Sequence, residues 1–196
     1  MPRLWLLTDP LRLPDPMPIL PRLPRGAAVL ARGMPEAALP PLAVACRRRG
    51  LRLLVGGDGR LALRLAAGLH VPERGAPGLL AFLRARRPGA LLSAACHGLR
   101  GLARGRRLRC DALLLSPLFP TDSHPEARPL GPHGWAWLAR GAGRACIALG
   151  GIRPATLGRV PPIATGVAAI GWWRGLEAGL AAEDALCQMA DRDGRA

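Results

Sequence analysis

Lysine, asparagine and tyrosine are absent from this 196-residue chain, and aromatic residues make up only 4% of it. All 28 basic residues are therefore arginines, against 13 acidic residues, and the formal net charge is +15. Arginine, alanine, glycine and proline use G/C-rich codons, so genome composition accounts for much of this bias. With few aromatic rings to stack on bases, the charge does not favour a nucleic-acid partner, and a solvated basic surface is the better interpretation.

The chain also lacks a long apolar run. No stretch reaches the roughly 18 residues of a membrane span, and Met1–Leu20 carries charges and prolines where a secretory signal would be unbroken. The five cysteines form no C-x-x-C pair and no zinc-site spacing. We therefore expect a cytoplasmic protein with buried thiols and no membrane partner. Cys96 and His97 are not expected to form a nucleophile–base pair, because neighbours in a strand point to opposite faces.

Short apolar runs alternate with longer segments in which Leu and Ala recur at helical spacing. The runs predict eight strands, at Leu4–Thr8, Ala27–Ala31, Leu51–Val55, Gly68–Val71, Ala90–Ala94, Ala112–Ser116, Cys146–Leu149 and Gly166–Ile170. The intervening segments predict helices at Leu42–Arg49, Leu61–Ala67, Leu79–Arg86, Leu99–Arg107 and Trp135–Ala142. Strands that alternate with helices imply crossover connections and a parallel sheet.

Eight such units predict a compact, single-domain (β/α)8 TIM barrel. We expect the barrel to span residues 1–183, and 184–196 to hold the end of the last helix and a polar tail. The proline-rich first crossover, Leu11–Leu23, is the weakest of the expected helices. A doubly wound open sheet remains the structural alternative, because periodicity does not distinguish it from a closed barrel.

Glycines end the last two predicted strands. Gly150 and Gly151 follow the seventh strand, and Gly171 follows Ile170 at the end of the eighth. Each pair alone is typical of an ordinary strand end. Together they favour a phosphate site, because the loops after strands seven and eight commonly bind phosphate in such barrels and glycine lets the backbone approach the oxygens.

Several motifs, in order along the chain, resemble those of the thiamine phosphate synthase/TenI family. Leu4–Asp9 is similar to the family's opening L-Y-L-I-T-D, Gly68–Val71 to G-V-H-L, Ser116–His124 to G-P-x-F-P-T-x-T-K, Ala148–Ile152 to A-I-G-G-I and Gly166–Ile170 to G-x-x-x-I. The resemblance implies a (β/α)8 barrel that couples a pyrimidine-methyl pyrophosphate to a thiazole phosphate, with Mg²⁺, and releases pyrophosphate.

The resemblance also implies roles for individual residues. Thr121, Ser123 and His124 would contact the pyrophosphate, and the N–H groups around Gly150, Gly151, Ile170 and Gly171 would hold the thiazole phosphate. His124 stands where the family has a lysine, and Arg32 lies near the family's second-strand arginine. These two residues are the candidates for catalysis.

The chain departs from the family at the positions of the metal-binding residues. The positions of the family's two metal carboxylates fall on Gly57 and near Gly75, which leaves Asp58 as a weak candidate ligand and Glu73 as a second oxygen source. Any Mg²⁺ is therefore expected to arrive with the substrate. The alternatives are a noncatalytic or divergent TenI-like binder or regulator of phosphorylated ligands and, ranked lower, a basic RNA-binding barrel. The oligomeric state is left open.

Overall fold

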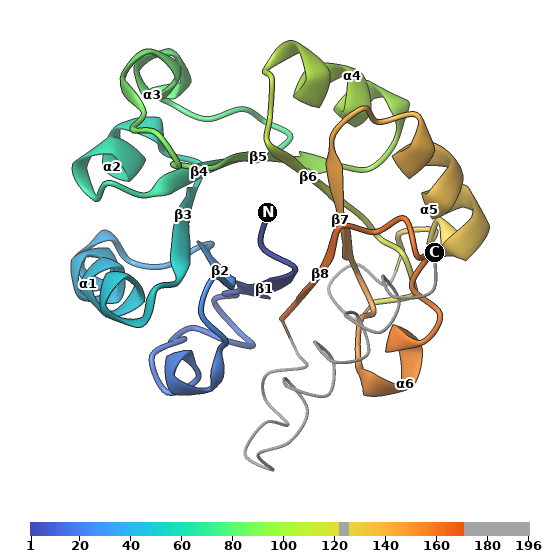
Figure 1. Ribbon diagram of the computed structural model, residues 1–196, viewed down its shortest axis with the longest axis horizontal. Coiled ribbons are helices and arrows are strands. Elements are labelled where there is room, and N and C mark those ends of the chain that lie inside the picture. The colour runs from blue at the N-terminus through green and yellow to red at the C-terminus, as the bar shows by residue number, and fades with distance from the viewer. Residues whose placement is uncertain (122–125, 171–196) are drawn as a thin grey trace.

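The computed structural model describes residues 1–121 and 126–170. Eight parallel strands close into one barrel, in which each strand pairs with the next and β8 pairs with β1. The strands are β1 (Leu4–Leu7), β2 (Ala28–Ala31), β3 (Arg52–Gly56), β4 (Gly68–Val71), β5 (Leu92–Cys96), β6 (Ala112–Leu115), β7 (Ala145–Leu149) and β8 (Gly166–Ala169). The closed ring excludes the doubly wound open sheet and confirms the predicted barrel (Figure 1).

Helices lie outside the ring of strands (Figure 1). They are α1 (Leu39–Arg49), α2 (Gly59–Arg64), α3 (Leu79–Ala85), α4 (Leu99–Arg107), α5 (Gly131–Arg140) and the short α6 (Pro154–Leu157), with 3₁₀ turns η1 (Leu20–Arg22) and η2 (Glu36–Ala38). Helices on the outside and side chains inside cover the strands on both faces, so β1, β2, β4, β6 and β8 are buried throughout. Continuous apolar runs, rather than alternating ones, were therefore the correct signal for strands.

The eight predicted strands are all present, with ends that differ by at most two residues. The expected helix in the first crossover is wrong, because that segment forms only the 3₁₀ turn η1. Its prolines lack the N–H groups that a helix interior needs. The start of α1 was placed too late for a related reason, because prolines occupy its first turn, where a missing N–H costs nothing.

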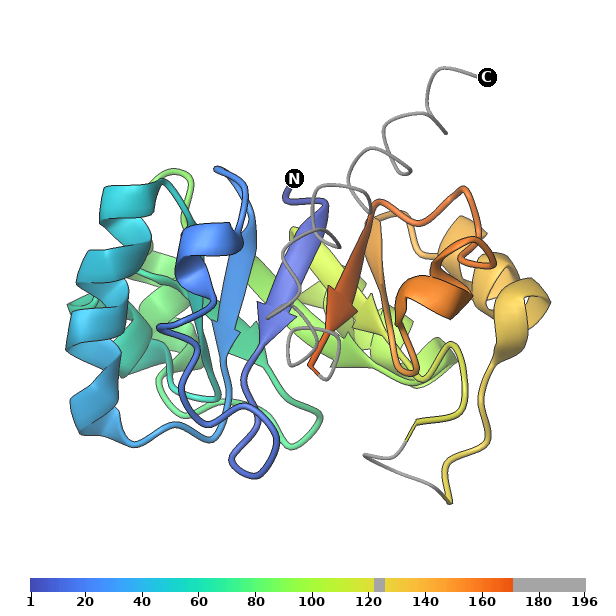
Figure 2. The same cartoon turned by 90° about the horizontal axis from the view of Figure 1, so that it is seen from below.

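All strands point toward the same end of the barrel, and the loops after β1, β4 and β6 extend from that end (Figure 2). Side chains that follow different strands are thereby brought around one opening, where barrels of this type carry their sites. The expected boundary between residues 183 and 184, and the expected last helix and tail, lie outside the described residues. Among the helices described, none is long and apolar enough to cross a membrane.

Candidate active site

A cavity of about 970 Å³ opens at the carboxyl ends of the strands. Its walls include apolar residues from the strand ends, backbone at Gly150 and Gly151, and charged side chains from the loops. The arginines that line it are Arg12, Arg32, Arg74 and Arg153, and the carboxylates are Glu73 and Glu126. These charged side chains surround the opening of the cavity, called the mouth below. A mouth with more guanidinium than carboxylate groups suits an anionic ligand.

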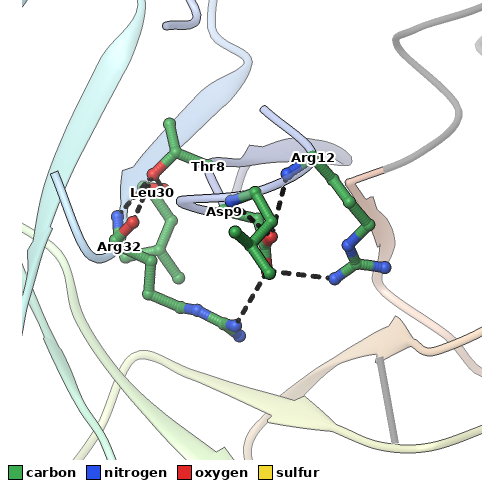
Figure 3. A network of polar contacts seen from close by, with 6 residues as sticks. Thr8, Asp9, Arg12, Leu30 and Arg32 are labelled. Carbon is green, nitrogen blue, oxygen red and sulfur yellow. Dashed lines mark hydrogen bonds and ion pairs between the residues drawn. The ribbon is translucent and has the colours of Figure 1, made fainter. Parts of the chain in front are cut away.

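Two of these arginines are held by one aspartate in the loop after β1. Asp9 Oδ2 accepts a hydrogen bond from Arg12 Nη2 at 3.0 Å and lies 3.7 Å from Arg32 Nη2 (Figure 3). Asp9 Oδ1 accepts from the N–H groups of Leu11 and Arg12. The hydrogen bond from Arg12 is the main reason why the pKa of Asp9 falls from 3.8 to about 2. Asp9 is thus a fixed anion that orients two cations.

Thr8 anchors the backbone of Arg32 from the neighbouring strand. Its Oγ1 accepts from the Arg32 N–H at 2.6 Å and donates to the Arg32 carbonyl at 2.9 Å (Figure 3). The reciprocal pair ties the end of β1 to the residue that follows β2, so that the backbone of Arg32 is held in place. The Thr8-Asp9 dipeptide that resembles a family motif therefore organises the arginines of the mouth.

Gly150 and Gly151 form the cavity wall beyond β7. Both have left-handed backbones, with φ of +98° and +65°, and both press against the Pro117–Pro120 segment so closely that a Cβ atom would meet its backbone. Leu118 and Phe119 donate hydrogen bonds to the carbonyls of Leu149 and Gly150 along this contact. These glycines are thus required by the approach of two loops, whatever the ligand. Among the described residues, the N–H groups of Gly151 and Ile152 have no hydrogen-bond acceptor.

Two histidines that the sequence did not indicate as site residues line the cavity. His70 Nδ1 lies 3.0 Å from Ser93 Oγ, and burial followed by the positive charges of Arg32 and Arg104 lowers the pKa of His70 to about 3. His97 Nδ1 lies 2.9 Å from the carbonyl of Ser116. His70 had a signal in the Gly68–Val71 motif, which resembles the family's G-V-H-L, whereas His97 had only its place near a strand end.

Cys96 is not an activated nucleophile. The side chain is fully buried, and burial raises the pKa of its thiol. Its Sγ donates to the Gly98 carbonyl, whereas the neighbouring His97 faces the cavity. This geometry agrees with the expectation that the pair points to opposite faces. Burial also raises the thiol pKa of Cys46, Cys110 and Cys146.

The structure brings several predicted site residues to the cavity. Arg32, Thr121, Gly150, Gly151 and Ile170 all line it. Ser123, His124 and Gly171 lie outside the described residues, so their expected contacts remain predictions. The roles that the family resemblance gives to all of these residues also remain predictions.

Asp58 has a different position. It caps the N-terminus of α2, where its Oδ1 accepts from the N–H groups of Arg60 and Leu61 at 2.8 and 2.9 Å. It does not line the cavity. Within residues 1–121 and 126–170, no three side chains of His, Cys, Asp or Glu are grouped so that they could hold a metal ion. The described residues therefore form no complete cage for a metal ion, and the carboxylates that line the cavity are those of Glu73 and Glu126.

Comparison with known proteins identifies the family to which this chain is similar. Residues 35–176 match the thiamine monophosphate synthase family. The chain is 33% identical over 132 residues to the thiamine biosynthesis bifunctional protein ThiM/ThiE of Symbiobacterium thermophilum, a match that covers 64% of this chain and 27% of that protein. It is 32% identical over 80 residues to a provisionally named thiamine-phosphate synthase 2 of Aquifex aeolicus. That match covers 40% of this chain and 42% of the relative.

The chain thus spans less than half the length of these two relatives. Among solved structures, a thiamine phosphate pyrophosphorylase from Pyrococcus furiosus superposes with a TM-score of 0.73 at 20% identity, covering 97% of this chain and 94% of that one. That likeness supports the fold. The family match covers most of the chain, and it agrees with the motifs and the barrel: the protein belongs to the thiamine monophosphate synthase family.

Proposed function

We propose that the protein is a thiamine phosphate synthase-type transferase, which joins a pyrimidine-methyl pyrophosphate to a thiazole phosphate. The observation that carries the proposal is the cavity, which combines glycine backbone after β7 with paired arginines after β1 and β2. Strands β7, β8, β1 and β2 are consecutive in the barrel, so the two anion-binding features share one side of the mouth. A pair of phosphorylated substrates needs two such features within reach of each other.

In this proposal the thiazole phosphate accepts hydrogen bonds from the N–H groups of Gly151 and Ile152. The pyrophosphate lies against Arg12 and Arg32. The carbon–oxygen bond to the pyrophosphate breaks and its electron pair leaves with the oxygen, while the lone pair of the thiazole nitrogen forms the new carbon–nitrogen bond. No proton is transferred. Guanidinium groups fixed by Asp9 lower the barrier, because they neutralise charge that grows on the leaving group.

A noncatalytic binder of phosphorylated ligands is the second candidate. It is favoured by the glycines at the family's two metal positions and by the use of Asp58 as a helix cap. Loss of the metal ligands would remove catalysis and leave phosphate binding intact. The two candidates therefore predict the same binding and different chemistry.

A small ligand is favoured over RNA by the position of the arginines. Arg12, Arg32, Arg74 and Arg153 gather around one concave opening at the strand ends. A polymer needs an extended basic track, with aromatic side chains on which bases can stack. We infer small phosphorylated ligands on this basis.

The deciding experiment incubates the full chain with both substrates and measures thiamine phosphate, with Mg²⁺ and separately with EDTA. Calorimetry with the thiazole phosphate alone runs in parallel. The transferase proposal requires binding and product. Binding without product in either buffer would establish the binder instead, and absence of both would refute the two candidates together.

A further inference from the structure

The two positions of the family's metal carboxylates have room for side chains. Gly57 has a φ of +84°, and a Cβ atom there would meet only Pro72 Cγ, at 3.8 Å. Gly75 has a φ of +89°, and a Cβ atom there would meet nothing within 4 Å. Aspartate and asparagine tolerate this left-handed conformation better than most residues. Packing therefore does not exclude carboxylates at these positions, and yet the chain carries none.

Two carboxylates remain near these positions, of which Glu73 lines the cavity and Asp58 is committed elsewhere. Asp58 gives one oxygen to two N–H groups at the start of α2, and loss of such a cap costs about 1 kcal/mol. Rotating its carboxylate toward the cavity would leave those donors unpaired. The aspartate nearest the paired arginines, Asp9, is already bound to both of them.

Cationic side chains outnumber carboxylates in the cavity lining, with four arginines against Glu73 and Glu126. Arg12 and Arg32 line the cavity and share Asp9 Oδ2, whereas Asp9 does not itself reach the cavity wall. Arg74 extends from the loop after β4, immediately before Gly75, and also lines the cavity. Within the described part of the chain, Arg74 forms no ion pair. Its charge is therefore available to a ligand.

Guanidinium groups can replace a divalent cation in binding a diphosphate. Each offers a planar fork of N–H donors that matches two phosphate oxygens, and each keeps its charge at any physiological pH. Arg12 and Arg32 are already oriented by Asp9, so part of the entropic cost of ordering them is met before the ligand arrives.

We propose that Arg12, Arg32 and Arg74 form a diphosphate subsite that works without a divalent cation. The inference rests on the proposed function, because it assigns that subsite to the pyrophosphate of the pyrimidine substrate. It goes further in one respect: the arginines supply the charge neutralisation that a divalent cation would otherwise provide, since glycines stand at or near the family's two metal-carboxylate positions.

The test is calorimetric titration of the full chain with inorganic pyrophosphate, in EDTA and in Mg²⁺. We expect binding in EDTA, with no increase in affinity when Mg²⁺ is added. Arg12→Gln and Arg74→Gln should each weaken binding about tenfold, since each removes a charge-assisted contact. Arg74→Gln is the safer variant for folding, because the wild-type side chain is exposed and forms no ion pair within the described residues.

Arg48→Gln is the matched control. Arg48 is exposed in the last turn of α1, away from the cavity, and its replacement removes the same charge. Binding that requires Mg²⁺, no binding in either buffer, or equal losses in Arg48→Gln and Arg12→Gln would each overturn the subsite. Product formation alongside Mg²⁺-dependent binding would leave the transferase standing and refute only the subsite. Binding in EDTA without product formation would support the subsite and refute the transferase.

Discussion

At the scale of single residues, the mouth depends on charges that the fold fixes before any ligand binds. The Asp9 carboxylate holds two guanidinium groups, and Thr8 holds the backbone of one of them. The sequence showed Thr8 and Asp9 as the end of a motif that resembles the family's opening strand, and Arg12 as part of an expected helix. Their cooperation depends on a turn after β1, in which Asp9 accepts from two N–H groups, and no periodic pattern indicates such a turn.

His70 should make the protein sensitive to moderate acid. Its pKa in the folded state is about 3, whereas a histidine in the unfolded chain has a pKa near 6.5. The unfolded state therefore binds a proton first as pH falls below 6.5, and the free energy of unfolding decreases by up to about 1.4 kcal/mol per pH unit. His70→Gln should remove this loss between pH 6.5 and 4.

Urea unfolding at pH 7 and pH 5 measures the effect. We expect the wild type to lose roughly 2 kcal/mol more than His70→Gln between these two values. His133→Gln, at an exposed position on α5, is the control and should behave like the wild type. Equal losses in the wild type and His70→Gln would contradict the account of His70.

At the scale of elements, α4 shows how closely a helix can approach the barrel. Gly101 is buried in α4, and a Cβ atom there would lie 2.9 Å from both the Cα and the Sγ of Cys96 on β5. The helix was predicted with both ends correct, because its apolar spacing is regular. Its contact with β5 could not be predicted, since a glycine inside a helical pattern indicates only a weak helix until the neighbouring strand is known.

A matched pair of glycine substitutions tests this packing. Gly101→Ala should destabilise the fold by about 2 kcal/mol, because the new methyl group must displace backbone of β5. Gly134→Ala in α5 should stabilise it by roughly 0.5–1 kcal/mol, since its Cβ meets nothing within 4 Å and alanine is the better helix former. Thermal and urea unfolding give both values. Stabilisation by both substitutions would show that helix propensity outweighs the contact.

Arg104 joins α4 to two strand ends. Its Nη1 donates to the carbonyls of Pro72 and Glu73, and its Nη2 donates to that of Ala95. Arg104→Gln should lower the free energy of unfolding by about 1–3 kcal/mol, because it leaves backbone acceptors unpaired. It should also increase proteolytic cleavage in the loop that holds Glu73 and Arg74. The exposed neighbour Arg107 serves as control, and an equal effect of Arg107→Gln would contradict this role.

At the scale of the whole molecule, chain order predicted the barrel better than it predicted the site. Eight apolar runs separated by helical segments predicted parallel strands covered on both faces, and their number favoured a closed barrel over a doubly wound open sheet. The site combines loops that are far apart in sequence, and only those with a family motif could be identified beforehand. Arg74 and Arg153 lie in loops without a regular pattern, and only closure of the ring brings them to the same cavity.

Four of the 28 arginines behind the net charge of +15 line the cavity. Most arginines lie elsewhere on the molecule, and those at the mouth face one cavity. The central claim is that the cavity takes a phosphorylated thiazole against the backbone of the β7 loop. If this is correct, the phosphate of the bound ligand must lie beside the loop that follows β7.

The most direct test is a crystal structure of the full chain with thiazole phosphate bound, in which the distances from the phosphate oxygens to the N–H nitrogens of Gly151 and Ile152 are measured. We expect hydrogen-bond distances of about 2.7–3.2 Å to at least one of these nitrogens, with the thiazole ring inside the cavity. A phosphate held by arginines on the outer helices, with the cavity empty of ligand, would contradict it.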